Sequence, residues 1–208
     1  MKINFKHGKG NKLHIMVDGE YFMTSNNDFV ALSGIKDGSE ITEEELADFQ
    51  ESVNSNRAFN KAADLLSRRD HSSKELLQKL RQKGFSEGAE EAIERLSNFG
   101  YIDDRRFAER YADELRRIKK YGKRRIKDEL YRKGIDSEII DEIVSEIEFD
   151  NDELVSIIER KYIRNLGDEK GIRKTFAALT RMGYSFSEIK EALNAVANAE
   201  NVADEDYL

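Results

Sequence analysis

Apolar residues recur along this chain with the period of amphipathic helices, and three of the segments that show this period resemble one another. They read LRQKGF (residues 80–85), LYRKGI (residues 130–135) and LTRMGY (residues 179–184). In the first two, an apolar residue lies four and again eight positions before the glycine, and in all three another follows nine or ten positions after it. The spacing predicts helices with one apolar stripe, separated by a glycine in the left-handed conformation. One supersecondary unit is therefore expected three times.

This repeat predicts how the chain is divided. We expect nine helices in three groups of three, with repeat 1 at residues 57–101, repeat 2 at residues 102–149 and repeat 3 at residues 150–199. Residues 200–208 are expected to form an acidic tail. Because units of this kind bury their apolar faces against their neighbours, the predicted fold is mainly α, an elongated and curved array of three tandem three-helix repeats.

Residues 1–56 follow another pattern and are expected to form a small β-hairpin element and a leading helix. Apolar and polar residues alternate over residues 13–17, and the Asp-Gly pair that follows is typical of a hairpin turn. The segment 29–32 is a further strand candidate. A capping-box pattern that begins at Thr42 predicts a helix ending near residue 52.

The composition narrows the class of protein. Cysteine is absent, which excludes disulfides and thiolate metal sites, and no apolar run near the N-terminus has the length of a signal peptide or a membrane span. Proline is absent as well, where average usage gives about ten in a chain of this length, and a helical array tolerates that absence. We therefore expect a soluble, cytoplasmic and monomeric protein without a membrane partner.

Residues that carry out catalysis or bind cofactors form no recognisable pattern. The three histidines, His7, His14 and His71, have no carboxylate cluster at ligand spacing beside them, so surface or turn positions are expected. The segment HGKGN (residues 7–11) lacks the Lys-Ser/Thr pair of a phosphate loop, which favours a hairpin turn. Neither a nucleophile motif nor paired catalytic carboxylates stand out. The sequence therefore predicts a protein that is not an enzyme and uses no cofactor or metal.

The net charge of −7 conceals a regular alternation along the chain. Residues 57–83 carry a net charge of +5, and residues 84–104 carry −5. Residues 105–133 carry +8, and the next block, residues 134–153, contains nine acidic residues and no basic one. The third repeat continues the pattern with +4 and then −5. If the repeats stack in register, the basic helices align along one edge and the acidic helices along the other.

The densest basic segment is RRIKKYGKRRIK (residues 116–127), in which eight of twelve residues are Lys or Arg. Cations at this density can hold the phosphates of a nucleic acid or an acidic protein surface, and Tyr121 can stack on an unpaired base. The alternative is a solvated helix face, balanced by neighbouring acids and favoured where a helix ends. We favour a contact role because the net charge of +8 over residues 105–133 is larger than neighbouring acidic residues ordinarily leave on a solvated helix face. The candidate contact residues are Arg105, Arg106, Arg116, Arg117, Lys119, Lys120, Tyr121, Lys123, Arg124, Arg125, Lys127, Arg132 and Lys133.

Aromatic and acidic residues beside the basic segment have roles of their own. Tyr101, Phe107 and Tyr111 are spaced along one helix face or its entrance, so packing in a core is expected for them. The acidic block at residues 136–153 is either a contact for a basic partner or the solvated side of a third helix, and the sequence favours neither.

Three long segments of the chain resemble one family of proteins. They are LLSRRDHSSKELLQKLRQKGF (residues 65–85), LSNFGYIDDRRFAERYA (residues 96–112) and KKYGKRRIKDELYRKGI (residues 119–135). Together they resemble the RecX family of regulators of bacterial recombination, and the resemblance extends over about residues 57–199. It implies a non-enzymatic protein of tandem three-helix repeats.

The resemblance also implies a partner. Members of this family bind the nucleoprotein filament of the RecA recombinase in its groove and limit its ATPase and strand-exchange activities, with single-stranded DNA reached through the filament. On this basis the basic segment is expected to contact phosphate or acidic filament surfaces, and the acidic third helices basic ones. The third repeat departs from the pattern because Met182 replaces a cation. A direct DNA-binding protein and a helical scaffold for another protein remain alternatives.

Overall fold

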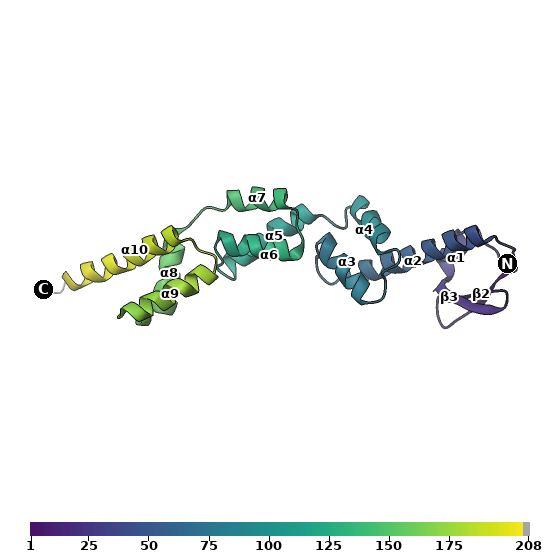
Figure 1. Cartoon of the computed structure of the whole chain (residues 1–208), viewed down its shortest axis with the longest axis horizontal. Helices are drawn as coiled ribbons and strands as arrows, with labels where there is room; N and C mark the ends of the chain where they lie inside the picture. The colour runs from purple at the N-terminus through teal and green to yellow at the C-terminus, as the bar shows by residue number, and fades with distance from the viewer. Residues whose placement is uncertain (206–208) are drawn as a thin grey trace. The chain divides into compact units, whose positions relative to one another are not determined.

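The structure is a computed structural model that describes residues 1–205, with side chains described up to residue 198. Its elements fall into two units, Met1–Asp103 and a second unit that begins at Asp104. A small three-stranded sheet opens the first unit, and helices follow in both units (Figure 1). The prediction of a mainly α fold built from three-helix repeats with a small N-terminal β element is confirmed.

The predicted hairpin is present and is extended by one strand. The antiparallel strands β1 (Ile3–His7), β2 (Lys12–Val17) and β3 (Glu20–Asn26) lie in this order in the sheet. Asp18 and Gly19 both adopt positive φ, of 50° and 88°, which is the conformation that a two-residue hairpin turn requires. The other hairpin turn, between β1 and β2, contains the HGKGN segment, as expected.

The prediction of a further strand over residues 29–32 is wrong. These residues lie in the helix α1 (Asn27–Leu32), and Asn26, at the end of β3, caps it by accepting a hydrogen bond of 2.7 Å from the Phe29 amide. The apolar run FVAL resembles a short strand in sequence, but Val30 buries one side of a helical turn against the sheet. A cap at Asn26 and one apolar anchor therefore decide the conformation.

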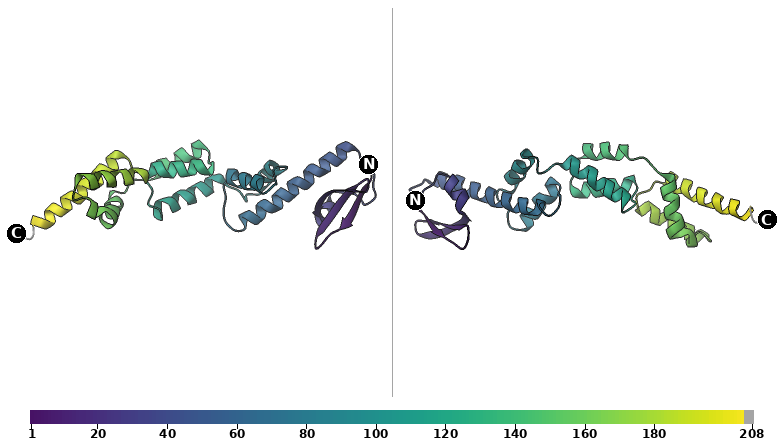
Figure 2. Two further views of the ribbon diagram at one scale, coloured as in Figure 1. Left: turned by 60° about the horizontal axis from the view of Figure 1, so that its bottom comes forward. Right: turned by 180° about the vertical axis from the view of Figure 1, so that it is seen from behind.

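The helix α2 (Glu43–Leu66) is longer than predicted. It begins at the expected capping box, in which the Thr42 hydroxyl accepts from the Glu45 amide and the Glu45 carboxylate accepts from the Thr42 amide. It does not end near residue 52, so the leading helix and the first helix of repeat 1 are one element. The first half of its stripe packs on the sheet and the second half on the core of repeat 1 (Figure 2). Two separate cores therefore stabilise one helix.

Repeat 1 is completed by α3 (Ser73–Gln82) and α4 (Ala89–Asn98). Leu76, Leu80 and Leu96 are almost completely buried between these helices and α2. The repeat glycine Gly84 has a φ of 82° and ends α3, as the sequence predicts.

The buried imidazole of His71, at the entrance to α3, makes the stability of repeat 1 depend on pH. Burial, and the nearby Arg69, lower the pKa of His71 from its usual 6.5, although Glu75 lies 3.2 Å from its Nδ1. As the pH falls below about 6.5, the unfolded chain therefore binds more protons than the folded one. The free energy of unfolding decreases as a result. We expect the melting-temperature difference between the wild-type protein and a His71→Asn variant to shrink from pH 7.5 to pH 5.5. An equal difference at both pH values would contradict this assignment.

The second unit contains two repeats of three helices. Its elements are α5 (Asp104–Arg117), α6 (Lys123–Lys133), α7 (Ser137–Glu146), α8 (Asn151–Tyr162), a short 3₁₀ helix η1 (Ile163–Asn165), α9 (Glu169–Arg181) and α10 (Phe186–Glu205). Each repeat has its own apolar core, formed by α5 to α7 and by α8 to α10. Over the described residues, α2 to α10 supply the nine helices that were expected after residue 57.

Two further details of the fold differ from what the sequence predicts. Helix α10 continues to Glu205, so most of the expected acidic tail is helical, and the rest of it lies outside the described residues. Tyr101 is 65% exposed and does not pack in a core, whereas Phe107 and Tyr111 do, as predicted. The difference arises because Tyr101 lies in the connection between two repeats, where no apolar stripe covers it.

No described helix is long and apolar enough to cross a bilayer.

Candidate anion-binding surface on the second unit

The centre of the basic segment is the connection between α5 and α6. Lys120 adopts a φ of 57°, a left-handed conformation that is uncommon outside glycine, and its amide donates to the Arg116 carbonyl at the end of α5. Two further interactions hold it there: its Nζ lies 2.5 Å from Glu153 Oε1, and its carbonyl accepts a 3.1 Å hydrogen bond from the Tyr184 hydroxyl. Lys120 therefore has a structural role between repeats 2 and 3.

Six of the predicted contact cations form ion pairs with carboxylates of the same unit. The pairs are Arg105 with Glu142, Arg117 with Asp113, Lys120 with Glu153, Arg125 with Glu129, Lys127 with Asp141 and Arg132 with Glu129. The hydrogen bond to Asp141 raises the pKa of Lys127, and the one to Glu142 raises the pKa of Arg105. The pairs of Arg105, Arg117 and Lys127 are exposed on both sides, so each of these three contributes little to stability. They nevertheless orient these side chains towards neighbouring helices.

Some of these pairs account for part of the charge alternation. Lys127 on α6 and Arg105 on α5 both pair with carboxylates of α7, so the basic and acidic blocks of repeat 2 meet within the repeat. Repeat 1 has a similar pair between Arg81 on α3 and Glu90 on α4. The acidic third helices of repeats 1 and 2 therefore partly neutralise their own repeats.

Four candidate residues remain without a carboxylate at ion-pair distance within the described part of the chain. They are Arg116, Lys119, Lys123 and Arg124, and they flank the turn at Lys120 on both sides. Lys119 and Arg124 are exposed, and Arg116 and Lys123 are half-buried. These four side chains, which we call the free cation cluster, are the ones that an anionic partner can reach without breaking an ion pair.

Helix electrostatics separate two members of this cluster from the others. Arg116 lies in the last turn of α5, where a cation interacts favourably with the helix dipole. Lys123 and Arg124 lie in the first turn of α6, which contains no acidic residue, and there the dipole disfavours positive charge. Helix stability therefore explains Arg116 but not Lys123 and Arg124, whose positions favour a contact with an anion.

The remaining candidate residues have other surroundings. Tyr121 is half-buried against the core of repeat 2, and the Arg125 guanidinium lies 5.5 Å from its ring centroid. The Lys133 ammonium lies 5.4 Å from the ring of Tyr111. Arg106 is on α5 and exposed.

A close contact between repeats 2 and 3, which the sequence analysis missed, positions the free cation cluster. The carbonyl of Met182, at the end of α9, accepts from the Gly122 amide at the start of α6, at 2.8 Å. A side-chain carbon at Gly122 would lie 2.5 Å from the carbonyl oxygen of Gly183. Gly183 was recognised only as the glycine of the third repeat, because sequence spacing gives no sign of which backbone it meets.

The hydroxyl that bridges the two repeats is also buried. Burial, with a smaller effect of the nearby carboxylate of Glu153, raises the pKa of Tyr184 to about 12. Its phenol therefore stays protonated and keeps donating to the Lys120 carbonyl throughout the neutral range. The turn that carries the free cation cluster is thus held by repeat 3.

Comparison with known proteins shows which proteins this chain is similar to. A sequence model for the first three-helix domain of RecX matches residues 58–96, and one for the second matches residues 103–143. The regulatory protein RecX of Caldanaerobacter subterraneus subsp. tengcongensis is 31% identical over 91% of this chain and 95% of its own length. That of Clostridium acetobutylicum is 32% identical over 96% of this chain and 97% of its own length.

The chain belongs to the RecX family. The resemblance seen in the sequence is thereby confirmed, and a regulatory role follows from it. A crystal structure of a regulatory protein RecX superposes with a TM-score of 0.67 at 22% identity and covers 93% of this chain and 98% of the other, so it shares the fold. The second RecX domain contains the whole free cation cluster, whereas Gly183 and Tyr184, which hold that cluster in place, lie beyond it.

Proposed function

We propose that this protein regulates homologous recombination by binding the RecA nucleoprotein filament in its groove and reducing its ATPase and strand-exchange activities. It acts as a binding protein and not as an enzyme, in the cytoplasm and as a monomer. Single-stranded DNA is met through the filament. Membership of the RecX family supports the choice of partner class, since the curated relatives are named regulatory proteins.

The observation that carries this proposal is the free cation cluster. A nucleoprotein filament presents DNA phosphates together with charged protein surfaces, and both attract uncompensated cations. Lys123 and Arg124 stand where the helix dipole disfavours them, so a partner that supplies negative charge there removes an unfavourable interaction.

Acidic side chains of the same unit support a second type of contact. Glu138 and Glu146 on α7 are exposed, and neither forms an ion pair within the described residues. They can meet basic groups of a protein filament, whereas they would repel the phosphates of a bare DNA duplex. This arrangement favours a filament over naked DNA as the partner.

The test compares two partners under the same conditions. Binding of the purified protein is measured to ATP-loaded RecA filaments on single-stranded DNA and to the same DNA without RecA, while ATP hydrolysis is followed. We expect tighter binding to the filament and slower hydrolysis. Equal binding to bare DNA with unchanged hydrolysis would replace the proposal with a DNA-binding function, and binding to neither would leave a scaffold for another protein.

A further inference from the structure

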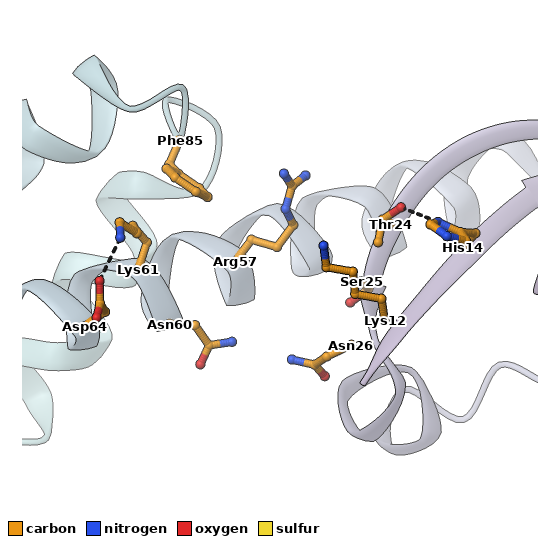
Figure 3. Close-up of a pocket in the computed structure, with 10 residues that line it drawn as sticks. All are labelled: Lys12, His14, Thr24, Ser25, Asn26, Arg57, Asn60, Lys61, Asp64 and Phe85. Atoms are coloured by element: carbon orange, nitrogen blue, oxygen red, sulfur yellow. Dashed lines mark hydrogen bonds and ion pairs between the residues drawn. The ribbon is translucent and has the colours of Figure 1, made fainter. Parts of the chain in front are cut away.

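A cleft in the first unit lies between the open end of the β2–β3 hairpin, at Lys12 and Asn26, and the second half of α2 (Figure 3). Its volume is about 590 Å³, which is in the range of pockets that hold small organic ligands. The packing of the sheet on the first half of α2 fixes one wall relative to the other.

Two cations face this cleft from opposite walls. Lys12 extends from β2 and Arg57 from α2 towards the same space (Figure 3). Within the described residues, neither has a carboxylate at ion-pair distance. The acidic residue of the lining, Asp64, is already bound by Lys61 at 2.7 Å and by Arg68 at 3.2 Å. The cleft therefore has an excess of positive charge that no carboxylate among the described residues neutralises.

Neutral polar groups lie beside the two cations. Ser25 is 5% exposed, and its hydroxyl has no hydrogen-bond partner among the described residues. Asn26 and Asn60 point towards each other from the two walls (Figure 3). A buried hydroxyl without a partner costs free energy, and a polar ligand in the cleft would supply one.

The third component is the aromatic ring of Phe85, in the connection between α3 and α4. The ring packs against the core of repeat 1, so its position is fixed, and the Arg57 guanidinium lies 5.9 Å from its centroid. Cations that hold phosphate next to an aromatic ring on which a base can stack are the combination used by proteins that bind single strands. An acidic peptide would use the cations but would leave the ring without a function.

We propose that this cleft binds a nucleotide, with its phosphate between Lys12 and Arg57 and its base against Phe85. The nucleotide is either free or part of a single strand. This site shares no residue with the free cation cluster, and its test needs no RecA. The result of that test is therefore independent of the proposed binding to RecA.

The absence of tryptophan from the chain allows a local test. In the full-length protein, a Phe85→Trp variant places one fluorophore in the lining of the cleft. We expect saturable quenching by a short oligothymidylate at low salt. Quenching by thymidine monophosphate as well would assign a free nucleotide, and quenching by the oligonucleotide alone would assign a strand.

A second pair of substitutions tests the phosphate contacts. Lys12→Ala with Arg57→Ala, in the Phe85→Trp background, is expected to weaken the quenching affinity by about tenfold or more, because two charge-assisted contacts are lost. Lys36→Ala with Lys74→Ala removes the same charge from exposed positions outside the cleft and is expected to leave it unchanged.

Three results would overturn the proposal. They are no quenching, equal effects of the two double variants, and displacement of the oligonucleotide by an acidic peptide of the same charge. If Phe85→Trp does not fold, photo-crosslinking of a 5-iodouracil strand to the wild-type protein replaces it. A crosslink in the peptide that contains Phe85 is then expected, and its absence would refute the site.

Discussion

Replacing Gly183 by alanine is expected to destabilise the second unit by about 2–5 kcal/mol and to separate repeats 2 and 3. Gly183 has a φ of 95°, which costs about 1–2 kcal/mol for a residue with a side-chain carbon. That carbon would also overlap the backbone amide of Arg125 and lie 2.5 Å from the Arg125 side chain, and such overpacking costs about 1–3 kcal/mol. Hydrogen exchange followed by mass spectrometry would show this destabilisation as faster amide exchange in α6 and α9.

Gly84 provides the matched control for this prediction. It occupies the equivalent place in repeat 1 and has a φ of 82°, but nothing lies within 4 Å of the position of an added side-chain carbon. A Gly84→Ala variant is expected to lose only about 1 kcal/mol, from the left-handed conformation alone. Equal losses in the two variants would mean that the contact between repeats does not contribute.

Reversing the charge of Lys119, Lys123 and Arg124 is expected to weaken binding to the RecA filament by roughly 100-fold or more at low salt. These three cations form no ion pair within the described residues, so their reversal breaks none there. Removing positive charge from the first turn of α6 should also stabilise that helix slightly. Filament binding is followed by fluorescence anisotropy, and thermal melting is measured alongside it.

The control for the charge reversal has the same total charge. Lys2, Lys9 and Lys36 are exposed residues of the first unit, and changing all three to glutamate keeps the net charge of the two variants identical. This control is expected to bind almost normally, with a small loss from long-range attraction. A similar loss in both variants would show that only net charge matters and would remove the free cation cluster from the proposed interface.

Much of the architecture could be predicted because it depends on local patterns. Apolar residues at helical spacing and a glycine after each middle helix are properties of neighbouring residues, so the three repeats and their helices were recognisable. The capping box at Thr42 correctly predicted where α2 begins. The predicted end of α2, near residue 52, was wrong because the helix packs against two cores. The sequence shows only that no residue interrupts the helix.

The sequence by itself determined where positive charge is concentrated, and the tertiary structure decided which charges are available. Lys120 and Lys127 belong to the same basic segment as Lys123, but carboxylates from α8 and α7 neutralise the first two. Such pairs join residues that are far apart in the chain, so spacing cannot reveal them. The same reason applies to Gly122 and Gly183, whose close approach depends on how two separately folded cores meet.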